Sequence, residues 1–237
     1  MLATIVAAIE DAGHIAGPEG VAIALDPAAS EFHHDGRYVV AGEALSTFRM
    51  IDYYVDLLDR FPIWSIGDGL AEADWDGWVE FTARIGETTQ VVGDEIFVTN
   101  PEIIRNAIAG KVGNTALIKV NQIGTVTEAL EALQVCREAG YAAMISYRSG
   151  ETVDSFIANL AIGSGCGQLT SGAPAPGERI AKYNRILEVA DAHPGLEMAG
   201  QGDAVIGSFQ DVEGGFAGLA GTLISSNVTG VERRTAR

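Results

Sequence analysis

The sequence predicts an α/β protein, specifically a (β/α) barrel of the TIM type that is incomplete, with six strand–helix units. Short apolar runs rich in Val and Ile alternate with longer amphipathic stretches, which implies parallel strands joined by helical crossovers. Hydrophobic residues make up 47% of the chain and aromatic residues only 7%, which favours close strand–helix packing over a sandwich built on large rings. The 237 residues suffice for one well-buried domain, and barrels commonly have about this size.

The predicted elements follow one another in a regular order. A helix opens the chain at residues 2–12, and Gly13 stands at its C-cap position. The strands that follow are short and end near polar residues, as buried parallel strands that reach a polar mouth do. We predict strands at 21–26, 62–68, 89–95, 115–121, 142–147 and 167–173, and helices at 44–60, 74–85, 101–109, 125–139, 155–162 and 177–192.

Local signals set several of these boundaries. The dipeptide Asp35-Gly36, in a polar segment after the first strand, is typical of a hairpin turn. Pro101 stands in the first turn of its helix, where its missing N–H removes no helical hydrogen bond. Thr125 and Glu128 have the spacing of a capping box, and Gly140 ends the same helix.

The chain divides into two regions. Residues 1–198 form the predicted partial barrel, and residues 199–237 form a tail rich in Gly and Ser. The tail has no clear hydrophobic period, so we expect it to be loosely ordered.

Charge and cysteine content narrow the classes of partner. The formal net charge of −17 argues against nucleic acid and anionic membrane surfaces as partners. No stretch reaches the ~18 apolar residues that a membrane span needs, and the N-terminus lacks a basic segment of the kind that begins a signal peptide. The two cysteines show no CxxC spacing, which favours a reduced, cytoplasmic protein.

Lys119 is the sharpest chemical signal, because it lies in the otherwise apolar segment TALIKVN. Chemistry in such barrels takes place at the C-terminal ends of the strands. A lysine at that polar mouth can act as a general base for a proton next to a carboxylate. The alternative is a lysine at the sheet edge whose ammonium group extends to solvent.

Four further residues at strand ends are candidates for binding. Asp26 and Asp94 each end a strand, and their carboxylates could converge on one hard cation such as Mg²⁺. Arg148 and Ser149 follow another strand directly, and an arginine beside a hydroxyl is suited to an oxyanion or a phosphate. Aspartates that cap helices, and an arginine paired with a nearby acid, would produce the same sequence pattern.

Six long segments, covering about residues 9 to 189, are similar to consecutive segments of enolases, in the same order and with nearly the same spacing. Agreement over long unbroken segments is more specific than a single short motif. The segments are ALDPAASEF, SIGDGLAEADW, VVGDEIFVTNPE, LIKVNQIGTVTEA, SYRSGETVDSFIANLAIG and GERIAKYNRILEV.

This resemblance implies a function and a set of residue roles. Enolases are glycolytic lyases that use Mg²⁺ to dehydrate 2-phosphoglycerate to phosphoenolpyruvate. The resemblance makes Lys119 the proton-abstracting base and makes Asp26 and Asp94 two of the metal ligands. It also makes Arg148 and Ser149 the residues that hold the phosphate.

Three positions depart from the enolase pattern, and all three lie at the ends of strands. Gly67 stands where the family has a metal-binding glutamate, Tyr147 where it has an active-site histidine, and Thr170 where it has a second lysine. Losing a metal ligand or a substrate-binding cation lowers the rate by on the order of 10² or more. We therefore expect inefficient dehydration from this chain alone.

Three functions are compatible with these residues. The first is enolase activity on a small phosphorylated carboxylate, and the second is a related enzyme acting on another phosphorylated or phosphonate carboxylate. The third is a degenerate barrel without catalysis that serves as a binding module. The chain could assemble as a homo-oligomer, or with a second chain that supplies further strands.

Overall fold

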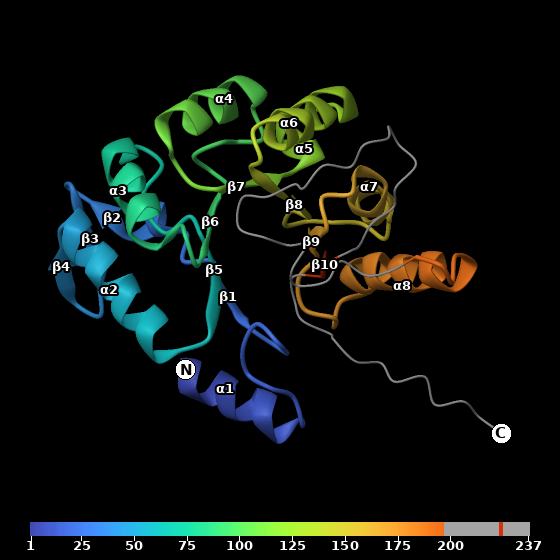
Figure 1. Cartoon of the computed structure of the whole chain (residues 1–237), viewed down its shortest axis with the longest axis horizontal. Helices are drawn as coiled ribbons and strands as arrows, with labels where there is room; N and C mark the ends of the chain where they lie inside the picture. The colour runs from blue at the N-terminus through green and yellow to red at the C-terminus, as the bar shows by residue number, and fades with distance from the viewer. Residues whose placement is uncertain (197–222, 225–237) are drawn as a thin grey trace.

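The computed structural model describes residues 1–196 and 223–224. Six parallel strands hydrogen-bond in chain order and curl into a half-barrel, with the helices packed around its outside (Figure 1). This arrangement confirms the predicted incomplete barrel. The six strands are β1 (Ile23–Leu25), β5 (Ile63–Gly67), β6 (Gln90–Gly93), β7 (Thr115–Ile118), β8 (Ala142–Ser146) and β9 (Gln168–Thr170).

Seven of the described helices occupy predicted positions to within a few residues, whereas the short helices η1 and α5 were not predicted. The first helix ends beside Gly13, which has a φ of +83°. The last helix has the bounds that the sequence predicts. The helices are α1 (Leu2–Asp11), η1 (Ala29–Phe32), α2 (Thr47–Arg60), α3 (Trp75–Ile85), α4 (Pro101–Gly110), α5 (Val120–Ile123), α6 (Val126–Glu138), α7 (Phe156–Ser164) and α8 (Gly177–Ala192).

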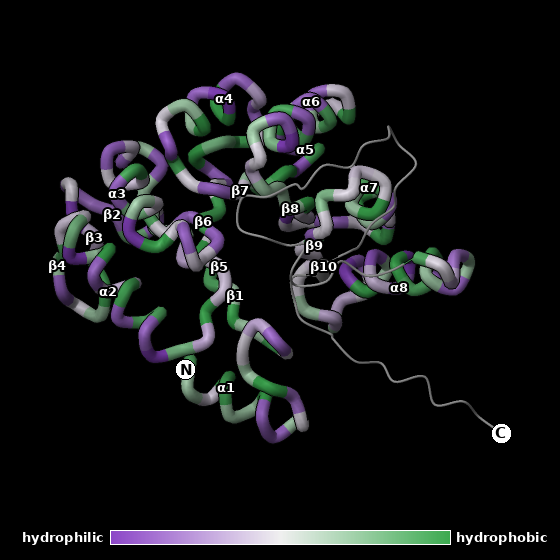
Figure 2. The backbone as a smooth tube through the Cα atoms, in the orientation of Figure 1, coloured by the Kyte–Doolittle hydropathy of each residue, from purple (hydrophilic) through white to green (hydrophobic). Residues whose placement is uncertain are grey.

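The two faces of the half-barrel bury different side chains. Val91 and Ala116 belong to the main core, which the outer helices cover, whereas Val92 and Leu117 form a separate cluster with Met144. Successive strand residues point to opposite faces, so Val92 and Leu117 lie on the inner face. The tube in Figure 2 is hydrophobic along β7 and alternates in hydropathy along the helices, as helices with one buried side do.

A three-stranded antiparallel sheet follows β1 in the chain. It includes residues that were predicted to begin the next helix. It contains β2 (His33–His34), β3 (Arg37–Val40) and β4 (Glu43–Leu45). The hairpin turn at Asp35-Gly36 is confirmed, with φ values of +51° and +72°. The predicted start of the next helix at residue 44 was wrong, because β4 pairs with β3 and Ser46 caps α2.

The predicted strand through residue 121 also ends earlier. β7 stops at Ile118, and Lys119 occupies the N-cap position of the short helix α5. The backbone of Lys119 is still extended, with φ −124° and ψ 105°. Its side chain therefore continues the alternation of β7 and shares the inner face with Leu117.

The predicted N-cap of α6 at Thr125 is confirmed. The Thr125 hydroxyl accepts the N–H of Glu128 at 3.2 Å and donates to the Glu128 carboxylate at 2.6 Å. Asp74 caps α3 in a similar way, since its Oδ1 accepts the N–H of Gly77 at 3.1 Å. These caps fix the starts of two helices that pack on the outside of the half-barrel.

The predicted tail at 199–237 lies outside the described residues, apart from β10 (Leu223–Ile224), which pairs in parallel with β9. Both cysteines are buried and free. Within the part of the chain that the structure describes, every helix is too short or too polar to cross a membrane.

Candidate active site at the strand ends

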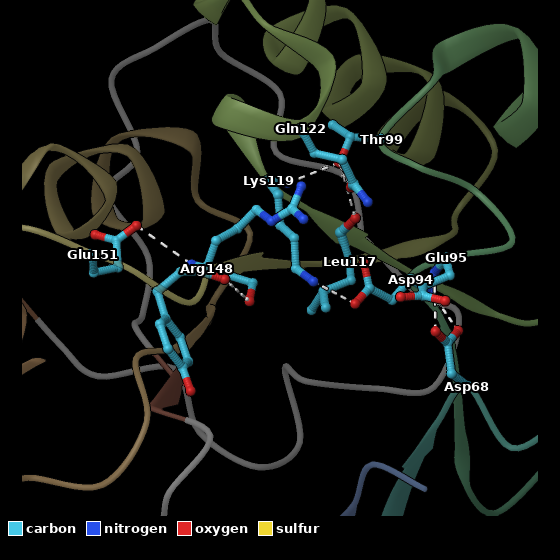
Figure 3. Close-up of polar contacts among 11 residues, drawn as sticks. Asp68, Asp94, Glu95, Thr99, Leu117, Lys119, Gln122, Arg148 and Glu151 are labelled. Carbon is cyan, nitrogen blue, oxygen red and sulfur yellow. Dashed lines mark hydrogen bonds and ion pairs between the residues drawn. The ribbon is translucent and has the colours of Figure 1, made fainter. Parts of the chain in front are cut away.

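An ion pair between Lys119 and Asp94 lies at the centre of the candidate site (Figure 3). Asp94 directly follows β6 and Lys119 directly follows β7, so neighbouring parallel strands bring the two residues together. The Lys119 Nζ donates to Asp94 Oδ2, and the side chains are only 15% and 12% exposed. The ammonium group therefore does not extend into bulk solvent.

Asp68 holds the backbone beside Asp94. Its Oδ1 accepts the N–H of Asp94 at 2.9 Å and its Oδ2 accepts the N–H of Glu95 at 3.0 Å. The pKa of Asp68 is raised to about 6, chiefly by burial and also by the negative charges of Asp94 and Asp26, while the two N–H bonds partly offset the rise. Both carboxylate oxygens of Asp68 are thus engaged with backbone groups.

Asp26 lies on the other side of Asp94 and interacts with it through charge. The surrounding protein partly desolvates the Asp26 carboxyl and raises its pKa, and the negative charge of Asp94 acts in the same direction. The ammonium of Lys119 opposes both effects. A Cβ atom on Gly67 would lie 3.6 Å from Asp26 Oδ1, an ordinary van der Waals contact, so Gly67 directly adjoins this carboxylate.

Thr99 fixes the main chain of Lys119. Its hydroxyl accepts the Lys119 N–H at 2.9 Å and donates to Gln122 Oε1 at 3.0 Å. Val98 and Thr99 both have left-handed backbones, with φ values of +43° and +58°, which is strained for β-branched residues. Sequence reasoning missed Thr99, because nothing in the local sequence indicates this conformation.

Arg148 and Ser149 lie in the exposed loop that connects β8 to α7. The Arg148 N–H donates to Glu151 Oε1 at 3.4 Å. In Figure 3 the Arg148 side chain points from this loop toward the side of the site where Lys119 lies. The loop thus extends the Arg148 cation toward the side of the site where Lys119 lies.

Two of the substituted positions adjoin this loop. The Tyr147 N–H donates to the Thr170 carbonyl oxygen at 3.2 Å, which places the two residues on neighbouring strands. The guanidinium of Arg179, from α8, lies 4.9 Å from the centroid of the Tyr147 ring. This stack places a large aromatic ring and a cation directly beside Arg148 in the chain.

Asp26 and Asp94 are the residues that could hold a metal ion. Asp94 Oδ1 is buried and has no hydrogen-bond partner, so it is available as a ligand. Among the described residues, no cluster of three or more His, Cys, Asp or Glu has a metal-binding arrangement. The donor set fits Mg²⁺ in the mode in which one or two carboxylates are supplemented by water and substrate.

Known proteins are similar to this chain in sequence. Residues 1–202 match the family described as the enolase C-terminal TIM barrel domain. The chain is 52% identical over 187 residues to a protein named Enolase 2 from Methanospirillum hungatei, covering 78% of this chain and 44% of that protein. It is 51% identical over 197 residues to an enolase from Rubrobacter xylanophilus, covering 80% of this chain and 46% of that protein.

The chain thus spans less than half the length of these two relatives. The family match nevertheless extends over all six strands of the half-barrel and over every candidate site residue. On this evidence, the chain belongs to the enolase family and carries its C-terminal TIM barrel domain.

Proposed function

We propose that this site removes a proton from the carbon next to the carboxylate of a small phosphorylated acid. In enolases this step leads from 2-phosphoglycerate to phosphoenolpyruvate. The observation that carries the proposal is the Lys119–Asp94 pair at the inner strand ends, because it sets a largely buried amine where a base is needed. Both relatives are named enolase, which supports the same substrate class.

In this proposal Lys119 is the base and Arg148 and Ser149 hold the phosphoryl group. The net charge of −17 repels an anionic substrate, and Arg148 supplies a local positive charge against this field. Ser149 adds a hydroxyl that can donate to a phosphate oxygen.

We propose Mg²⁺ as the cofactor, held by Asp26 and Asp94. Three facts support this assignment: the electrostatic proximity of the two carboxyl groups, the unpartnered Oδ1 of Asp94, and the membership of the enolase family. Mg²⁺, when bound, supplies positive charge that stabilises the negative charge built up as the proton leaves. Asp68 supports the site from outside this ligand pair, since its oxygens bind backbone N–H groups.

The three substitutions predict slow turnover. Gly67 offers no ligand, Thr170 offers no cation to a substrate carboxylate, and Tyr147 lies beneath Arg179 in place of a histidine. Removing such groups costs on the order of 10² in rate apiece. The Tyr147–Arg179 stack also favours a second candidate, in which the site acts on a different phosphorylated or phosphonate carboxylate.

The test follows exchange of the C2 hydrogen of 2-phosphoglycerate with deuterated water by NMR, which detects proton removal without complete dehydration. With excess Mg²⁺ we expect slow exchange from the natural chain and none from Lys119→Met. Lys111→Met, at an exposed lysine that follows α4, is the matched control and should retain the rate of the natural chain. Equal exchange rates in Lys119→Met and Lys111→Met would contradict the role of Lys119.

We also propose a cytoplasmic location, supported by two free buried cysteines and an acidic chain. For assembly we propose a homo-oligomer or a complex with a chain that adds strands to the half-barrel. Light scattering of the purified chain distinguishes a monomer from either assembly.

A further inference from the structure

We propose that a buried ion pair between Lys182 and Glu151 positions the loop that carries Arg148 and Ser149. Lys182 lies on α8, and Glu151 lies in the loop between β8 and α7. The inference rests on the proposed function in one respect, since it takes Arg148 and Ser149 as the phosphoryl-binding groups. In this proposal Lys182 and Glu151 are positioning residues that act on the phosphoryl group only through that loop.

Lys182 is fully buried, with a relative exposure of 0%. Its Nζ lies 2.6 Å from Glu151 Oε2 and donates to the carbonyl oxygens of Thr152 at 2.6 Å and Glu178 at 2.8 Å. An ammonium group has three N–H donors, so all of them are used. Two of the three acceptors belong to the loop, and one belongs to α8 itself.

Glu151 connects Lys182 to the backbone of the proposed phosphoryl-binding residues. One carboxylate oxygen meets Lys182, and the other accepts the backbone N–H of Arg148 at 3.4 Å (Figure 3). Residues 148–150 are exposed, and Gly150 has a φ of +79°, so packing does little to fix the segment. Glu151 therefore links the Lys182 ammonium of α8 directly to the backbone of Arg148.

The first turns of α8 also contact the neighbouring strand ends. Arg179 stacks on Tyr147, and the Ser171 hydroxyl donates to the Arg179 carbonyl oxygen at 3.5 Å. Lys182 is three residues further along the same helix. Since α8 is held against the ends of both β8 and β9, it offers a fixed support for the loop.

Stability alone gives a weak reason for this arrangement. A buried ion pair seldom stabilises a fold more than apolar residues of the same volume, because both charges lose their hydration. The pair does fix the geometry of the loop, because the three hydrogen bonds of Lys182 hold Glu151 and the Thr152 carbonyl at defined positions relative to α8. We therefore assign its role to the geometry of the loop.

The experiment uses the full chain and the variant Glu151→Gln, which keeps the shape of the side chain and removes its charge. Lys182→Met removes all three bonds of a fully buried ammonium group and could unfold the protein. Glu151→Gln leaves that ammonium its two carbonyl acceptors and an amide oxygen, so it is the informative change. We expect hydrogen exchange at the amides of residues 148–152 to accelerate by at least about tenfold as a charge-assisted bond is lost. We expect the affinity for phosphoenolpyruvate, measured by calorimetry with Mg²⁺, to fall by about tenfold.

Glu188→Gln is the matched control, because it breaks an exposed ion pair with Arg185 on the same helix. It should leave both the loop exchange and the affinity at the values of the natural chain. Loop exchange in Glu151→Gln that equals exchange in Glu188→Gln would overturn the positioning role, whatever the affinity shows.

Arg148→Gln separates this inference from the proposed function. If Arg148→Gln and the natural chain bind phosphoenolpyruvate equally, or if neither binds it, the assigned role of Arg148 fails. The exchange rates of the loop in Glu151→Gln still decide whether the ion pair anchors it, since that measurement requires no ligand.

Discussion

At the scale of single residues, Asp68 combines a buried carboxyl with two backbone N–H donors. Its pKa is raised from 3.8 to about 6, so the folded state binds a proton more readily than the unfolded state. The contribution of this group to stability is greatest below about pH 4, falls as the pH rises toward 6 and is constant above that. A shift of this size corresponds to roughly 2–3 kcal/mol.

We therefore predict that Asp68→Asn removes a pH-dependent part of the stability. The free energy of unfolding, measured by urea titration from pH 3.5 to 7.5, should decline less steeply between pH 4 and pH 6 in the variant. Because asparagine has a single carbonyl oxygen, the variant also loses one of the two N–H bonds at every pH. Parallel curves for Asp68→Asn and the natural chain would contradict the raised pKa.

Gly67 offers a second prediction at this scale. A side chain fits there, since its Cβ would lie 3.6 Å from Asp26 Oδ1 and the backbone is not left-handed. Gly67→Glu adds a carboxylate next to Asp26, so we expect the affinity for Mg²⁺ to rise by at least about tenfold in calorimetry. Gly67→Gln is the matched neutral control, and equal Mg²⁺ affinities for the two variants would show that Asp26 is not at a metal site.

At the scale of elements, the N-cap of α3 connects three parts of the fold. Asp74 Oδ2 accepts the hydroxyl of Tyr38 from β3 at 2.8 Å and that of Thr47 from α2 at 2.6 Å. The Tyr38 hydroxyl also accepts the N–H of Ala71 at 3.1 Å. The small sheet is therefore tied to the half-barrel through the start of one helix.

We predict that Asp74→Ala lowers the free energy of unfolding by about 3 kcal/mol, because one cap is lost and the hydroxyls of the buried Tyr38 and the partly buried Thr47 lose their acceptor. Thr125→Ala removes a cap that lies at the surface, and it should cost only about 1 kcal/mol. Denaturant unfolding of both variants measures the difference. Equal losses would mean that Asp74 acts as a cap alone.

At the scale of the whole molecule, the net charge of −17 sets the response to salt. Excess negative charge repels itself more strongly in the compact state, and salt screens that repulsion over ~10 Å at 0.1 M. We predict that the thermal midpoint rises by a few degrees between 10 and 300 mM NaCl at pH 7. At pH 4 many carboxylates are protonated, so the same salt step should have a smaller effect; equal shifts at both pH values would contradict this account.

The sequence by itself determined the order of the elements, the half-barrel and the family. These follow from local features: the alternation of strand and helix periods, the capping residues and the long segments shared with enolases. The period of two along a strand also places Asp94 and Lys119 on one face at adjacent strand ends. These local features did not determine which partners the side chains at those strand ends contact.

Only the tertiary structure determined these contacts. Lys119 meets Asp94 across 25 residues of sequence, because β6 and β7 are neighbours in the sheet. Lys182 meets the Thr152 carbonyl across 30 residues, because α8 packs beside the loop that follows β8. The left-handed backbone of Thr99 and the start of α2 at Thr47 were likewise beyond local signals. The physical reason is the same in each case: pairing with distant segments outweighs the local preference of the residues concerned.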